Sequence, residues 1–149
     1  MWGVNRMLGK WIVLIFLFLG ALWDIKKKTV PKVFLLIWGI VSVIYFVFEI
    51  INGQNVLGLL LGVIPGIITL VLSIVTKEKI GLGDGLILIC VGCLQTIKDV
   101  LCMIIFSFIF LTVVLIFLLA IRRIGRSSRI PFVPFLFLGQ LITMYGGIL

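Results

Sequence analysis

Residues 11–31 read WIVLIFLFLGALWDIKKKTVP, an apolar run that ends at Asp24 and is followed by three lysines. Such a run is typical of a helix that crosses a bilayer, although its purely apolar part is short. Lysines directly after an apolar run indicate the cytoplasmic end of a transmembrane helix. The stretch therefore predicts a membrane helix that carries a carboxylate at its inner edge.

The composition indicates that the whole chain belongs in a membrane. Of its 149 residues, 63% are hydrophobic and 12% are charged, whereas soluble domains are about half apolar and about a quarter charged. The net charge of +8 comes from short loops, where cations set the topology and meet anionic lipid headgroups. We therefore expect a lipid bilayer, and no nucleic acid, among the partners. The length suits one domain over residues 1–149.

Apolar runs of up to roughly 20 residues recur along the chain and predict an all-α polytopic membrane protein, a bundle of about six transmembrane helices. The runs are continuous and do not alternate as the strands of a membrane barrel do. The fourth is barely long enough to span. The expected spans are Val4 or Trp11 to Trp23, Pro31–Ile51, Val56–Val75, Asp84–Thr96, Val100–Ile121 and Pro131–Ile148.

The positive charges concentrate in every second loop. One side of the expected bundle carries ten cations and the other carries three, which places both termini outside the cytoplasm and the acids Asp24 and Asp84 at the cytoplasmic face of the cell membrane. No small-residue cleavage site follows the first run, so we expect it to remain as a helix. The ten are Lys26, Lys27, Lys28, Lys32, Lys77, Lys79, Arg122, Arg123, Arg126 and Arg129; the three are Arg6, Lys10 and Lys98.

The residue types leave carboxylate chemistry as the hydrolytic option. The chain has no histidine, which excludes a Ser-His-Asp triad, a Cys-His dyad and an HExxH zinc site. Asp24 and Asp84 both fall at the expected inner membrane edge, where a carboxylate is costly to keep. Two adjacent aspartates share a proton, so that one activates water while the other polarises a carbonyl. We predict a membrane-embedded aspartic protease with this catalytic pair and with no cofactor or metal.

The two aspartates stand in different local settings. Asp84 is expected at a helix start, where the macrodipole favours the anion, and Asp24 at a helix end, where it does not. This makes Asp84 the readier anion of a pair that titrates as one unit. Gly81, Gly83 and Gly85 leave the nearby backbone bare, so that a substrate strand can approach. The structural alternative is a helix capped by Asp84, with Asp24 paired only to nearby lysines.

Three stretches resemble the type IV prepilin peptidases, a family of GxGD-type intramembrane aspartic proteases. They are Asp24 to Pro31, Gly81 to Asp84, and Ile130 to Phe135 with Gly139 beyond. The resemblance implies cleavage of the short basic leader from type IV prepilins or pilin-like proteins, just before a hydrophobic helix. It implies that Asp24 and Asp84 are catalytic, and that the site is shaped by Gly81, Gly83, Pro31, Pro131 and Pro134.

The chain also departs from that family. Longer members carry an additional cytosolic N-methyltransferase region with paired cysteines, for which this sequence has no room. We therefore expect leader cleavage without methylation. Cys90 and Cys93 lie in a predicted span and are expected to pack as small hydrophobes. Lys32 and Leu86 stand where many members have other residues, which bears on substrate preference. Glu78 is expected to be a surface partner of nearby lysines.

Two other functions remain open on the sequence. One is a small membrane transporter, or a substrate-binding membrane subunit, that uses interfacial acids; such proteins more often carry acids at mid-bilayer. The other is a non-catalytic assembly factor for a pilus machine, against which the presence of both aspartates argues.

Overall fold

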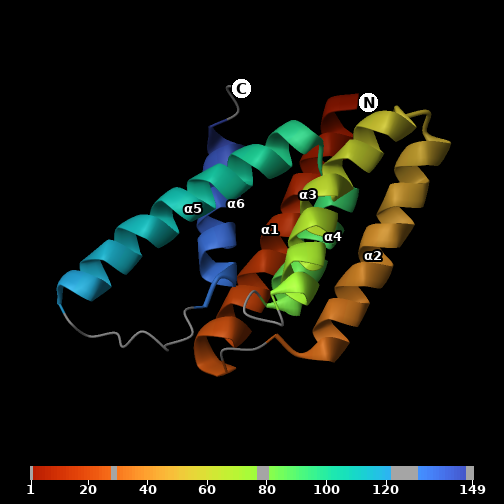
Figure 1. Cartoon of the computed structure of the whole chain (residues 1–149). Coiled ribbons are helices and arrows are strands. Elements are labelled where there is room, and N and C mark those ends of the chain that lie inside the picture. Colours follow the sequence, from red (N-terminus) through yellow and green to blue (C-terminus); the bar gives the residue numbers. More distant parts are fainter. Residues whose placement is uncertain (1, 28–29, 77–80, 122–130, 147–149) are drawn as a thin grey trace.

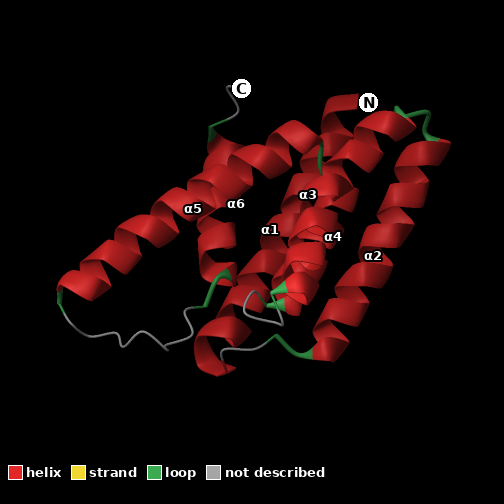
Figure 2. Ribbon diagram, viewed as in Figure 1, coloured by secondary structure: helices red, strands yellow, loops and turns green. Residues whose placement is uncertain are grey.

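The computed structural model describes residues 2–27, 30–76, 81–121 and 131–146. Within these ranges the chain forms α-helices and no strand (Figures 1 and 2). The all-α polytopic membrane bundle predicted from the sequence is confirmed. The helices are α1 (Trp2–Lys27), α2 (Lys32–Ile51), α3 (Val56–Val75), α4 (Leu82–Leu94), α5 (Ile97–Ala120) and α6 (Val133–Tyr145).

Two lengths of helix make up the bundle. The part of α1 from Met7 to Lys27, and the whole of α2, α3 and α5, are long and apolar enough to cross a membrane. Helices α4 and α6 have 13 residues each, about 20 Å of rise against a hydrocarbon core of about 30 Å. The expected fourth and sixth spans are therefore short helices, which stand beside longer neighbours.

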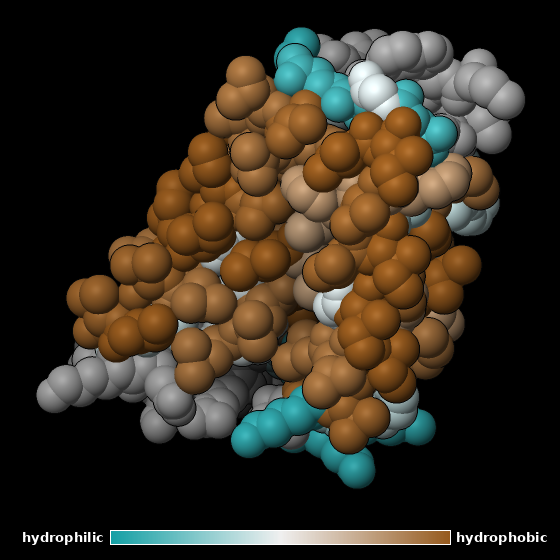
Figure 3. Space-filling view, turned by 90° about the vertical axis from the view of Figure 1, so that its right-hand side faces the viewer, coloured by the Kyte–Doolittle hydropathy of each residue, from teal (hydrophilic) through white to brown (hydrophobic). Residues whose placement is uncertain are grey.

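The surface carries the apolar band expected of a membrane protein. Figure 3 shows hydrophobic side chains over the middle of the molecule and hydrophilic ones at its two ends. On α2, Val33, Leu36 and Ile44 expose between 63% and 70% of their surface. Apolar exposure on this scale is unusual for a soluble monomer and is what a lipid-facing belt requires.

Helix α1 is longer than the sequence predicted. It continues past Trp23 to Lys27, so Asp24 lies inside its last turns and does not follow the helix. No proline or glycine interrupts residues 24–27, and Lys26 and Lys27 complement the negative end of the helix dipole. The basic residues that indicated a membrane boundary thus also extend the helix.

Helix α4 lies at the centre of the bundle, in contact with α1, α2, α3 and α5. Its closest packing is against α3, where glycines bring two backbones together: a Cβ atom on Gly62 would lie 2.6 Å from the carbonyl oxygen of Gln95. Gly66 is buried in the same interface, whereas a Cβ on Gly58 would meet nothing within 4 Å. Gly62 and Gly66 thus form a small-residue face on α3 that packs against α4, and this face does not include Gly58.

Helix direction brings distant segments to the same end of the molecule. In Figure 1 the C-terminal end of α1 lies at the same end of the bundle as the N-terminal ends of α4 and α6. The start of α1 and the end of α6 both lie at the opposite end. This arrangement places Asp24, near the end of α1, and Asp84, in the first turn of α4, at one end of the bundle.

Candidate active site

Asp24 is buried against the start of α6. Its side chain is only 7% exposed, and its Oδ2 atom accepts a hydrogen bond of 3.1 Å from the backbone N–H of Val133, the first residue of α6. The N–H of Phe132 adds a second, weaker hydrogen bond. Because a helix N-terminus carries unsatisfied N–H groups and a partial positive charge, these two hydrogen bonds favour the carboxylate anion and oppose the effect of its burial.

Asp84 lies in the first turn of α4, outside the four helices that are long enough to span. Its backbone N–H donates a 3.0 Å hydrogen bond to the carbonyl of Gly81, which closes the turn at the helix start. Burial of the carboxyl group, and secondly the negative charge of Asp24, raise the pKa of Asp84 from the ordinary 3.8 to about 6. Both effects disfavour the charged form.

The charge of Asp24 therefore acts directly on Asp84, although 60 positions of sequence separate the two residues. Contacts between α1 and α4 bring them together. Asp84 lies in the first turn of α4 as expected, and the amide donors of a second helix start, that of α6, go to Asp24. A carboxylate held by amide groups beside a carboxyl group of raised pKa is an arrangement that can share one proton.

The glycines around Asp84 have different surroundings. A Cβ on Gly81 would lie 3.1 Å from Oδ2 of Asp84, and a Cβ on Gly83 would meet only the end of Leu35, at 4.0 Å. The backbone beside Asp84 is thus open at Gly83, as expected. A Cβ on Gly85 would lie 2.9 Å from the Cα of Leu70 in α3, so Gly85 serves helix packing and the expectation that it faces substrate is wrong.

The three prolines named from the sequence stand at helix starts. Pro31 is the N-cap of α2, and its carbonyl accepts a 3.2 Å hydrogen bond from the N–H of Leu35. Pro134 lies in the first turn of α6, where a fixed φ suits the helix and a missing N–H costs nothing. Pro131 comes just before this turn. Val133, which lies between these two prolines, donates its backbone N–H to Asp24.

The backbone of Val133 is the site element that sequence reasoning missed. Only the proline at position 134 hinted at it, by indicating a helix start with free N–H groups. Glu78, expected to be a surface partner of lysines, lies outside the described residues. Cys90 and Cys93 are free thiols inside α4. Among the described residues no group of three or more Cys, Asp or Glu side chains could hold a metal ion.

Comparison with known protein families gives one result that bears on this site. The model of the type IV leader peptidase family matches residues 11–121, about three quarters of the chain. The matched range includes Asp24, Pro31 and Gly81 to Asp84, and it ends before Pro131. Comparisons with curated proteins and with solved structures gave no match.

Proposed function

This chain belongs to the type IV leader peptidase family, and we propose that it is an intramembrane aspartic endopeptidase that removes the basic leader from type IV prepilins or pilin-like proteins. The protein is a multi-pass membrane peptidase by its family and its helices. The observation that supports this proposed activity is the action of the Asp24 charge on Asp84, a residue of another helix at the same end of the bundle.

In the proposed mechanism Asp24 starts as the carboxylate and Asp84 holds the shared proton. Hydrogen bonds from the start of α6 support the charge on Asp24, and burial supports the protonated form of Asp84. Asp24 takes a proton from water while the water oxygen attacks the scissile carbonyl carbon, and Asp84 donates a hydrogen bond to the carbonyl oxygen. Collapse of the tetrahedral intermediate then passes a proton to the leaving amine.

The position of the pair fits a substrate whose cleavage point lies just before a hydrophobic helix. The aspartates stand near the end of α1 and at the start of α4, while the exposed side of α2 is apolar. A substrate helix in the bilayer would present its polar leader at this level. We place this end at the cytoplasmic face, because loops with ten of the thirteen cations of the sequence are expected there.

The test is processing of a co-expressed prepilin that carries a basic leader before its hydrophobic helix. Wild-type protein is expected to shorten it, and N-terminal sequencing of the product locates the cut. Asp24→Asn and Asp84→Asn are each expected to abolish processing at unchanged membrane abundance. Asp99→Asn is the matched control, because Asp99 pairs with Lys10 at the other end of the bundle. Full cleavage by either of the first two variants contradicts the proposed pair.

A further inference from the structure

A small cavity with several polar side chains in its wall lies at the end of the bundle away from the aspartates. Its volume is about 30 Å³, and its polar lining comes from the end of α2, the loop after it and the junction between α4 and α5. Apolar residues Leu59 and Leu94 complete the wall. The polar lining residues are Tyr45, Glu49, Gln54, Gln95, Thr96 and Asp99.

Two of these side chains are buried with polar atoms that no described group satisfies. Glu49 and Gln95 are each only 4% exposed. The Oε1 atom of Glu49, and both the Oε1 and Nε2 atoms of Gln95, have no hydrogen-bond partner among the described residues. Buried polar groups normally have partners, because leaving them unpaired costs the free energy of desolvation. Both side chains line the same cavity, which points to a polar ligand there.

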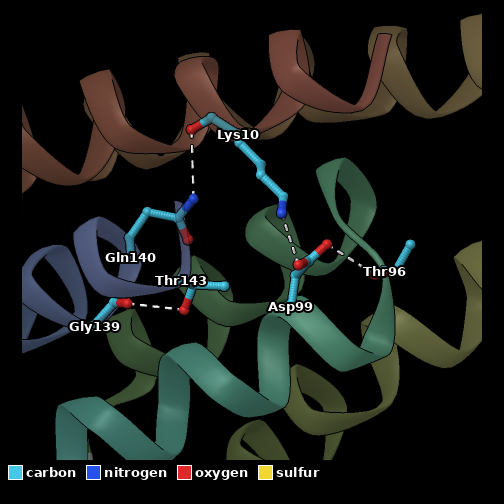
Figure 4. A network of polar contacts seen from close by, with 6 residues as sticks. All are labelled: Lys10, Thr96, Asp99, Gly139, Gln140 and Thr143. Atoms are coloured by element: carbon cyan, nitrogen blue, oxygen red, sulfur yellow. Dashed lines mark hydrogen bonds and ion pairs between the residues drawn. The ribbon is translucent and has the colours of Figure 1, made fainter. Parts of the chain in front are cut away.

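The charges around the cavity define the ligand. Asp99 is already compensated, since its Oδ1 lies 2.8 Å from the Lys10 Nζ and its Oδ2 accepts a 2.9 Å hydrogen bond from Thr96 (Figure 4). Glu49 receives a hydrogen bond from Tyr45, a neutral group. Among the described residues, Glu49 is thus the acidic side chain of the lining that has no basic partner. A single positive charge would balance it.

We propose that this cavity binds one monovalent metal cation, Na⁺ or K⁺, through the Glu49 carboxylate and the Gln95 side-chain carbonyl. The remaining polar lining offers hydroxyl and amide oxygens, the ligands that hard cations prefer. The volume holds one ion with no more than one or two waters. A divalent ion would leave an unbalanced positive charge in a buried position. The bound ion would join α2 to the α4–α5 junction.

The test is thermal unfolding of the detergent-purified protein, followed by tryptophan fluorescence. Midpoints are compared in sodium chloride, potassium chloride and N-methyl-D-glucamine chloride, each at about 150 mM. An alkali ion is expected to raise the midpoint saturably, by on the order of 5 °C, over the organic cation. Glu49→Gln and Gln95→Leu are each expected to remove this rise.

Gln140→Leu is the matched control, because Gln140 is a fully buried amide with an unpaired oxygen that does not line the cavity. It is expected to keep the rise. Equal midpoints in the three salts overturn the proposal, as does a rise that persists in both cavity variants. A rise with calcium chloride and with neither alkali salt overturns the charge argument. If Glu49→Gln does not fold, Gln95→Leu and the wild-type series decide the question.

Discussion

The backbone N–H of Val133 donates a 3.1 Å hydrogen bond to Oδ2 of Asp24, across 109 positions of sequence. This contact joins the first of the three stretches that resemble the family to the last of them. It also supplies a helix N-terminus to a carboxylate that stands near the unfavourable end of its own helix. The start of α6 is thus part of the candidate site.

The raised pKa of Asp84 predicts a loss of stability with rising pH. Its value of about 6 in the fold exceeds the roughly 3.9 of an unfolded aspartate, so the folded state holds the proton more tightly. The resulting stabilisation, about 3 kcal/mol, is present below about pH 4 and is lost as the pH rises to about 6. Unfolding midpoints measured across this window should show the decline. Asp84→Asn should abolish this decline. If the decline is unchanged in that variant, a group other than Asp84 causes it.

Loosening the start of α6 should lower prepilin processing strongly and the free energy of unfolding only slightly. Pro134→Gly removes the restraint on φ in the first turn and lets the N–H of Val133 move away from Asp24. We expect a fall in prepilin processing of about tenfold, with an unfolding free energy lowered by about 1 kcal/mol. Pro65→Ala in the middle of α3 is the matched control and should leave processing intact. If both variants process prepilin equally well, the start of α6 is not part of the active site.

Neighbouring glycines should respond differently to the same substitution. Gly85→Ala forces a Cβ against the backbone of α3, at 2.9 Å from the Cα of Leu70, and should cost about 1–3 kcal/mol of unfolding free energy. Gly83→Ala meets only Leu35, at 4.0 Å, and should fold as well as wild type. If substrate approaches Asp84 over this bare backbone, Gly83→Ala should still slow cleavage. Chemical unfolding and processing assays on both variants separate packing from substrate access.

The ion pair between Lys10 and Asp99 should support the fold and leave the chemistry alone. Both side chains are 22% exposed, so the pair is partly shielded from water and its loss in Lys10→Met should cost about 1–2 kcal/mol. A double-mutant cycle with Asp99→Asn would give the coupling energy. Prepilin processing by the folded fraction should match wild type. A large loss of cleavage in Lys10→Met would mean that the two ends of the bundle are coupled.

Part of the site was predictable because it depends on local sequence. Asp84 follows glycines at a helix start, and Pro31 and Pro134 stand where helices begin, as their fixed φ favours. The role of Gly85 was not predictable, because its contact is with Leu70 on another helix. The amide donors for Asp24 were not predictable for the same reason, since they come from α6.

The sequence by itself determined the membrane class, the order of the helices and the end of the bundle at which the acids lie, because hydrophobic run length and charge placement act locally. Only the tertiary structure decided which helix start faces Asp24 and that its charge reaches Asp84. In the membrane, helices associate through close packing of small residues. Gly62 packs against the end of α4, and this contact depends on the shapes of two segments that are distant in the sequence. Neither segment specifies the contact alone.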